Sequence, residues 1–216
     1  LSYFGMRTFQ LENVNGGLKR PVLNGKFTFM AGWLDQSWWP DGQYTAPSDD
    51  ALKFDVTVAK TFGFNMVRLH QKVNPQRWYY HADQLGVAIY QDAVQKYRGA
   101  TDATVPYFVH DLSEMIKERG NHPSIIQWET FNEADCWEVF TKASNYTVED
   151  IVALARSLDW QHRLVDTDSG GDANKLAVGD VNDIHDYPYP KDPKPSDTKY
   201  AMIGEFGGVG AFNVSH

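Results

Sequence analysis

From residue 27 onwards, short apolar runs typical of buried strands alternate with longer segments that have the spacing of helices. The seven predicted strands lie at residues 27–34, 65–69, 87–90, 124–128, 164–166, 183–186 and 200–204. The four predicted helices between them lie at residues 48–63, 74–85, 105–119 and 147–160. Strands that alternate with helices at this rate form a parallel sheet wrapped by helices.

Capping residues mark the ends of these helices. Ser48 precedes two acidic residues, Asp49 and Asp50, which favour a helix N-terminus. Thr147 and Asp150 have the spacing of a capping box, in which each side chain bonds the backbone of the other. The pattern therefore predicts where the helices begin, and it separates them clearly from the strands.

Two architectures fit such an alternation: a closed (β/α) barrel and an open doubly wound sheet. No glycine-rich phosphate loop follows the first predicted strand, which disfavours the open sheet. Glu133 and Glu205 follow the fourth and seventh strands, whose ends face each other across the mouth of a barrel. We therefore predict an α/β fold, a (β/α)8 TIM-type barrel truncated before its eighth strand.

The first 24 residues have a different pattern. They predict two short strands, at residues 3–11 and 17–23, joined by a turn rich in Asn and Gly. Such a hairpin has too little apolar surface to be stable alone. We therefore expect residues 1–24 to be the end of a preceding β-sandwich domain or a hairpin on the barrel floor. Residues 25–216 are expected to be the barrel, incomplete at its C-terminus.

The amino-acid composition argues against some classes of binding partner. The formal net charge of −8 argues against nucleic acid and anionic membranes. No run of 18 apolar residues predicts a membrane span. The single cysteine, Cys136, excludes an internal disulfide. Two matches to the glycosylation pattern, at Asn145 and Asn213, favour a secreted or extracytoplasmic protein only slightly, so the compartment stays open.

The stretch at residues 121–135 indicates chemistry. A buried apolar strand ends abruptly in Asn132 and Glu133, and the seventh strand ends in Glu205 in the same way. The carboxyl ends of barrel strands are where active sites lie, so these two glutamates predict a catalytic carboxylate pair. The alternative is that each glutamate is a solvated loop residue.

Five ordered segments resemble glycoside hydrolase family 2, within the large clan of retaining (β/α) barrel glycosidases. They are Phe131-Asn132-Glu133, Gly204-Glu205-Phe206-Gly207-Gly208 and residues 34–42, 65–70 and 185–188. The resemblance spans residues 3 to 210. The chain departs from the family pattern after Glu133, where Ala134-Asp135-Cys136-Trp137 replaces a Gly-Trp-Gly-like turn.

The resemblance implies a role for individual residues. It makes Glu133 the general acid/base and Glu205 the nucleophile, with Arg68 and Tyr187 bonded to the nucleophile. It implies that Asn132 holds the 2-hydroxyl of the sugar. The remaining predicted substrate-binding or supporting residues share a position near strand ends: His70, His185, Asp35, Asp92, Trp33 and Trp137. For Arg68, an ion pair that only holds the barrel together is the alternative, and for His70 a structural histidine.

The leading functional hypothesis is a retaining, exo-acting β-glycosidase that hydrolyses a terminal β-linked sugar by double displacement, with a β-galactosidase-like or related specificity. The second is a carbohydrate-binding, catalytically impaired fragment of such an enzyme. A metal-dependent hydrolase using His70 and His185 is disfavoured, because no His-x-His or His-Glu-x-x-His spacing occurs. We expect no metal or cofactor, a carbohydrate partner, and either missing flanking domains or self-association through an open sheet edge.

Overall fold

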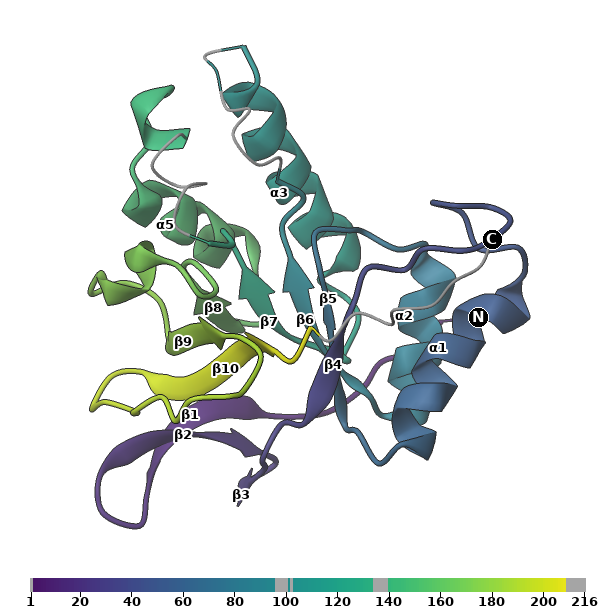
Figure 1. Ribbon diagram of the computed structural model, residues 1–216, viewed down its shortest axis with the longest axis horizontal. Coiled ribbons are helices and arrows are strands. Elements are labelled where there is room, and N and C mark those ends of the chain that lie inside the picture. The colour runs from purple at the N-terminus through teal and green to yellow at the C-terminus, as the bar shows by residue number, and fades with distance from the viewer. Residues whose placement is uncertain (1, 96–100, 102, 134–139, 209–216) are drawn as a thin grey trace.

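The computed structural model describes residues 2–95, 101, 103–133 and 140–208 (Figure 1). Its strands are β1 Phe9–Val14, β2 Leu18–Leu23, β3 Lys26–Phe27, β4 Gly32–Asp35, β5 Met66–Leu69, β6 Ala88–Asp92, β7 Ile125–Glu129, β8 Leu164–Asp166, β9 Val181–Asp186 and β10 Tyr200–Phe206. Its helices are α1 Asp49–Thr61, α2 Gln76–Leu85, α3 Val105–Arg119, α5 Val148–Leu158 and the 3-10 helix η1 Asp172–Lys175.

Strands β4 to β10 form the wall of a partial barrel. A parallel sheet has the order β4-β5-β6-β7-β8, and β9 and β10 form a parallel pair. The wall continues from β8 to β9 through the N–H of Asp180, which donates to the carbonyl of Val165 at 2.8 Å. Figure 1 shows the helices outside this curved wall. The predicted α/β architecture, a partial TIM barrel, is confirmed.

The helices begin where their capping residues predict. The Ser48 hydroxyl accepts from the N–H of Ala51 at the start of α1. Thr147 and Asp150 form the expected capping box at the start of α5, with both reciprocal hydrogen bonds present. These bonds satisfy backbone N–H groups that lack partners within the helix. Local sequence therefore fixes both helix starts, and the apolar faces then determine how the helices pack.

Two apolar clusters lie on opposite sides of the barrel wall. The larger packs α1, α2, α3 and α5 against the outer face of the sheet. The smaller lies inside the barrel, where Phe9 of the hairpin packs with Tyr90, Ile126, Tyr200 and Met202. Figure 1 shows the β1–β2 hairpin lying beneath β10. The hairpin thus buries its apolar side chains against the floor of the barrel.

The first barrel strand is shorter than predicted. The sequence favoured one strand over residues 27–34, but Phe27 pairs with Val22 of β2 in an antiparallel bridge. The side chain of Phe29 is exposed, and the barrel strand β4 begins only at Gly32. An apolar run does not reveal which sheet each of its residues joins, because that depends on partners far along the chain.

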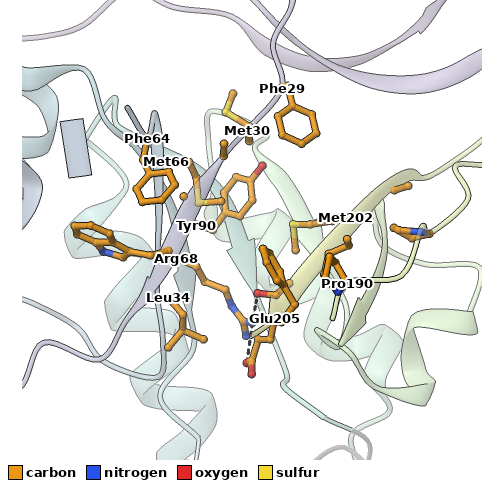
Figure 2. Close-up of a pocket in the computed structure, with 18 of the residues that line it drawn as sticks. Phe29, Met30, Leu34, Phe64, Met66, Arg68, Tyr90, Pro190, Met202 and Glu205 are labelled. Atoms are coloured by element: carbon orange, nitrogen blue, oxygen red, sulfur yellow. Dashed lines mark hydrogen bonds and ion pairs between the residues drawn. The ribbon is translucent and has the colours of Figure 1, made fainter. Parts of the chain in front are cut away.

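A groove separates β4 from β10. Among the described residues, neither β4 nor β10 pairs with another strand along the edge that faces this groove. The groove has a volume of about 990 Å³ and is lined by β4, β10 and the segment before β4 (Figure 2). Arg68 and Glu205 lie at one end of it. No helix in the described part of the chain is long and apolar enough to cross a membrane.

Candidate active site

Polar side chains from several strand ends converge at the mouth of the partial barrel. β5 contributes Arg68, β6 contributes Asp92, β9 contributes His185 and β10 contributes Glu205. Glu133 follows β7 by four residues. The carboxyl ends of parallel strands meet at one rim of a barrel, so residues far apart in the sequence come together here.

Glu205 has two donors. Its Oε1 accepts from Arg68 Nη1 at 3.0 Å, and its Oε2 accepts from the hydroxyl of Tyr187 (Figure 2 shows the first). The side chain of Glu205 is only 12% exposed. Burial raises the pKa of Tyr187, as does its hydrogen bond to Glu205, so this phenol keeps its proton and remains a donor. The two contacts place one hydrogen-bond donor on each carboxylate oxygen of Glu205.

Glu133 is held by its backbone in an uncommon conformation. Its φ is 61°, in the left-handed region. Its N–H donates to the carbonyl of Ser169 at 2.9 Å. Its Oε1 lies 3.3 Å from His185 Nδ1, and one of its carboxylate oxygens lies within 4.8 Å of one from Glu205. The strained backbone thus aims the side chain at the second carboxylate.

Arg68 connects the site to its supports. Its guanidinium donates to Asp92 at 2.9 and 3.0 Å and to Asn132 Oδ1 at 2.6 Å. His70 Nδ1 also lies 2.5 Å from Asp92 Oδ2. Burial alone would raise the pKa of Asp92, but the charge of Arg68 and the hydrogen bond to His70 outweigh it and lower that pKa. One buried cation therefore orients the Asn132 amide and Glu205.

The other predicted residues lie elsewhere or outside the described part. Asp35 accepts from the N–H and the hydroxyl of Ser37, so its carboxylate supports the turn after β4. Trp33 packs edge-on against Phe62 and Phe64, outside the barrel mouth, and also lines the groove. Trp137 lies outside the described residues. The structure thus brings together Glu133, Glu205, Asn132, Arg68, His70, Asp92, His185 and Tyr187, but not Asp35 or Trp33.

Three further carboxyl groups lie inside the barrel below Arg68. Glu129, Asp166 and Asp183 are buried, and one oxygen of each lies within 4.8 Å of the others. Burial raises the pKa of all three, and their mutual repulsion adds to the effect. The pKa of Asp183 rises to about 7. The sequence analysis treated Glu129 only as a structural partner and did not predict Asp166 or Asp183.

In the described ranges of the chain, two sets of donor atoms are close enough together for an ion, but we assign neither as a metal site. In the set of Glu133, His185 and Glu205, Arg68 and Tyr187 already occupy the oxygens of Glu205. In the buried set, burial and the neighbouring negative charges raise the pKa of all three carboxyls, and Asp183 already accepts from Ser169 and from the N–H of Gly204.

Sequence reasoning also missed Ser169. Its backbone pairs with Phe131 and Glu133, and its hydroxyl contacts Asp183 and lies 2.9 Å from His185 Nε2. A signal was present, since residues 166–171 form a polar, glycine-containing run directly after the fifth predicted strand. Its partners, however, come from the segment after β7 and from β9, and no local pattern identifies them.

The comparisons with known proteins agree with this geometry. Residues 22–203 match the family described as "Glycosyl hydrolases family 2, TIM barrel domain". A β-galactosidase of Lactococcus lactis is 28% identical over 200 residues, which cover 89% of this chain and 18% of that protein. A β-galactosidase of Leuconostoc mesenteroides is 31% identical over 145 residues, covering 60% of this chain and 14% of that protein.

Solved structures show the same fold. A β-glucuronidase from Ruminococcus gnavus in complex with uronic deoxynojirimycin has a TM-score of 0.60 and 25% identity, covering 75% of this chain and 27% of that one. The chain spans less than a fifth of the length of the curated relatives described above. The match over residues 22–203, the barrel strands and the strand-end site together show that the chain belongs to glycoside hydrolase family 2, as part of its TIM barrel domain.

Proposed function

We propose that this barrel is the catalytic unit of a retaining, exo-acting β-glycosidase that hydrolyses a terminal β-linked sugar by double displacement. The observation that carries the proposal is the pair Glu133 and Glu205, whose nearest carboxylate oxygens lie within 4.8 Å of each other. Retaining glycosidases have carboxyl groups about 5–5.5 Å apart, whereas inverting enzymes need about 6.5–9.5 Å to admit a water. The short separation supports retention.

The surroundings of the two carboxyls support a division of roles. Glu205 accepts from Arg68 and Tyr187, which orient its carboxylate for attack on the anomeric carbon. Within the described part of the chain, no Lys or Arg side chain pairs with Glu133, which lies next to His185 and has a side chain that is 48% exposed. Glu133 then donates a proton to the leaving oxygen and later takes one from the attacking water. Asn132, oriented by Arg68, is placed to bond the sugar 2-hydroxyl.

The relatives suggest a β-galactosidase-like or related specificity, since those compared are β-galactosidases and β-glucuronidases. The net charge of −8 favours a neutral sugar over an acidic one. A panel of aryl β-glycosides, assayed on the natural protein that contains this chain, tests both the activity and the sugar. Hydrolysis of one β-glycoside with β-product formed first is the expected outcome, and α-product formed first would contradict it.

A second candidate is a carbohydrate-binding, catalytically impaired fragment. The groove between β4 and β10 favours it, because this groove opens next to Glu205 and admits water there. Water weakens electrostatic stabilisation of a developing charge. Sugar binding without turnover by the 216-residue chain, measured by calorimetry with the sugar that the panel identifies, would favour this candidate.

A further inference from the structure

A chain of hydrogen bonds joins the buried carboxyls to Glu133. The hydroxyl of Ser169 contacts Asp183 Oδ2, and Ser169 Oγ lies 2.9 Å from His185 Nε2. On the other side of the ring, His185 Nδ1 lies 3.3 Å from Glu133 Oε1. We propose that Ser169 and His185 form a relay that shares one proton between Asp183 and Glu133. The role of Glu133 in this inference rests on the proposed function.

Backbone contacts hold two members of the relay, Asp183 and His185, in place. Asp183 Oδ1 accepts from the N–H of Gly204 at 2.5 Å, which leaves Oδ2 for the serine. Gly170, at a φ of +69°, packs against the His185 ring so closely that a Cβ there would lie 2.2 Å from it. A side chain at position 170 would therefore displace the imidazole. The backbone thus holds both the carboxyl and the ring in line with Ser169.

The charge of Asp183 decides which atom donates the proton in each hydrogen bond of the relay. When Asp183 is ionised, the single proton of Ser169 points to it, and Ser169 Oγ can only accept from His185. The neutral imidazole then has its proton on Nε2 and a bare Nδ1. A bare Nδ1 accepts, so Glu133 must be protonated to bond it. This is the form that a general acid needs.

The reverse order applies when Asp183 is protonated. The carboxyl proton of Asp183 is donated to Ser169 Oγ, and the serine proton is then donated to Nε2. The imidazole proton now lies on Nδ1 and is donated to an ionised Glu133. Passing from the first state to the second moves three protons: from Glu133 to Nδ1, from Nε2 to Ser169, and from Ser169 to Asp183. The net change is one proton transferred from Glu133 to Asp183, with no change in total charge.

Charged groups around the relay allow both states. Asp183 faces Glu129 and Asp166, and the negative charge of Glu129 together with burial raises its pKa to about 7. Arg68 faces Asp183 and opposes that rise. Asp183 therefore exchanges its proton near neutral pH, so it can both take up and release the proton that the relay carries.

Charged groups of both signs surround His185. Burial lowers the pKa of His185 and the charge of Arg68 acts in the same direction, and together they outweigh the charges of Glu205 and Glu133, which raise that pKa. Glu205 Oε1 lies 3.7 Å from Nε2 and favours a proton there. Arg68 Nη1, 3.5 Å from Nε2, donates to Glu205 at the shorter distance of 3.0 Å. The contact between Nε2 and Ser169 is therefore the one that sets the tautomer.

Nitrogen NMR of the His185 side chain tests the relay directly in the ¹⁵N-labelled 216-residue chain. When Asp183 loses its proton to solvent as the pH rises through about 7, Ser169 donates to Asp183 and accepts from Nε2, so the wild-type resonances should shift from the Nδ1–H to the Nε2–H tautomer. This titration removes one proton from the relay and so tests the coupling of the ring to Asp183, whereas transfer between Asp183 and Glu133 leaves the number of protons unchanged. Asp183→Asn cannot ionise, and its amide donates to Ser169 in place of the carboxyl proton. It should therefore keep His185 as the Nδ1–H tautomer throughout this pH range.

Ser169→Ala should abolish the pH-dependent tautomer change, because it removes the bridge while leaving both ends. Ser124→Ala is the matched control, since Ser124 is a buried serine whose hydroxyl has no hydrogen-bond partner among the residues that the structure describes. It should leave the His185 titration unchanged, and backbone amide spectra show whether each variant is folded. A wild-type His185 that never changes tautomer, or that changes equally in Ser169→Ala, would overturn the relay.

The experiments can contradict the relay without contradicting the proposed function, and the reverse. If no aryl β-glycoside is hydrolysed by the natural protein but the tautomer responds as expected, the relay stands and the glycosidase assignment falls. If turnover occurs with retention and the tautomer does not respond, the assignment stands and the relay falls.

Discussion

Arg68 is the single residue on which the candidate site depends most. It is buried, and its guanidinium contacts Asp92, Asn132 and Glu205. Arg68→Gln would leave Asp92 and Glu205 without their cation. Because breaking a buried ion pair leaves an uncompensated charge, we expect the free energy of unfolding to fall by about 3–5 kcal/mol in urea titrations.

The matched control for this substitution is Arg77→Gln. Arg77 pairs with Asp49 through two hydrogen bonds, but both side chains are about half exposed. Exposed pairs contribute little because water and salt screen them. The control should therefore leave stability nearly unchanged. Equal losses for the two variants would show that Arg68 does not hold a buried charge network.

The raised pKa of Asp183 predicts how stability depends on pH. Burial and the charge of Glu129 raise this pKa to about 7, whereas an unfolded aspartate titrates near 3.9. Between these values the folded chain binds more protons than the unfolded chain, so its stability falls as pH rises. One such carboxyl contributes a fall on the order of 1.4 kcal/mol per pH unit.

Urea titrations from pH 5 to pH 7 measure this slope. Asp183→Asn removes the titrating group, so stability should fall less steeply with pH than in the wild type. Asp111→Asn, at an exposed acid of α3, should retain the wild-type slope. The same slope in all three proteins would contradict the raised pKa.

At the scale of secondary structure, the β1–β2 hairpin contributes to the barrel floor. Phe9 is buried and packs against Tyr90, Ile126 and Met202 inside the barrel. Phe9→Ala should lower the free energy of unfolding by about 3–5 kcal/mol, because it removes buried surface and leaves a cavity. Phe4→Ala is the control, since the side chain of Phe4 is 83% exposed. An unchanged stability for Phe9→Ala in chemical denaturation would show that the hairpin is not part of the core.

Much of this element order could be predicted from the sequence because its signals are local. The capping residues of α1 and α5 form hydrogen bonds within their own helix ends, and the buried strand β7 has the β-branched and aromatic residues Ile125, Ile126 and Trp128. The exact start of β4 could not be predicted, because Phe27 has the apolar character of a barrel strand yet pairs with β2. That choice depends on contacts between residues far apart in the sequence.

For the candidate site, too, only some of the residues could be predicted from the sequence. Arg68 and Glu205 lie on recognisable strands, and Glu133 follows another. Their convergence could therefore be predicted from the barrel fold. Ser169 and Asp183 come into contact only when the loop after β8 packs against β9 in the folded chain. Sequence spacing carries no information about such a meeting, which is why both residues were missed.

At the scale of the whole molecule, the open edges of β4 and β10 are the main feature. Among the described residues, the groove between them has no strand pairing along either side, and Phe29 is 75% exposed at its margin. Unpaired strand edges with apolar surroundings promote association between chains. We expect the 216-residue chain to form dimers or larger species in light scattering.

Phe29→Lys should reduce this association, because a charge at the groove disfavours the approach of a second apolar edge. Phe54→Lys is the matched control. Phe54 is similarly exposed, at 63%, but lies on α1 and does not line the groove. Wild-type chain that stays monomeric at high concentration, or that responds equally to both substitutions, would show that the groove is not an association site.

The most direct test of the central claim is to trap the covalent intermediate. A 2-deoxy-2-fluoro aryl β-glycoside of the preferred sugar slows the second step more than the first, so the glycosyl-enzyme accumulates. Mass spectrometry of the natural protein that contains this chain should then find the sugar on Glu205, and Glu205→Gln should remain unlabelled. A label on Glu133 would reverse the two roles, and active protein that gives inverted product without any label would contradict the retaining mechanism.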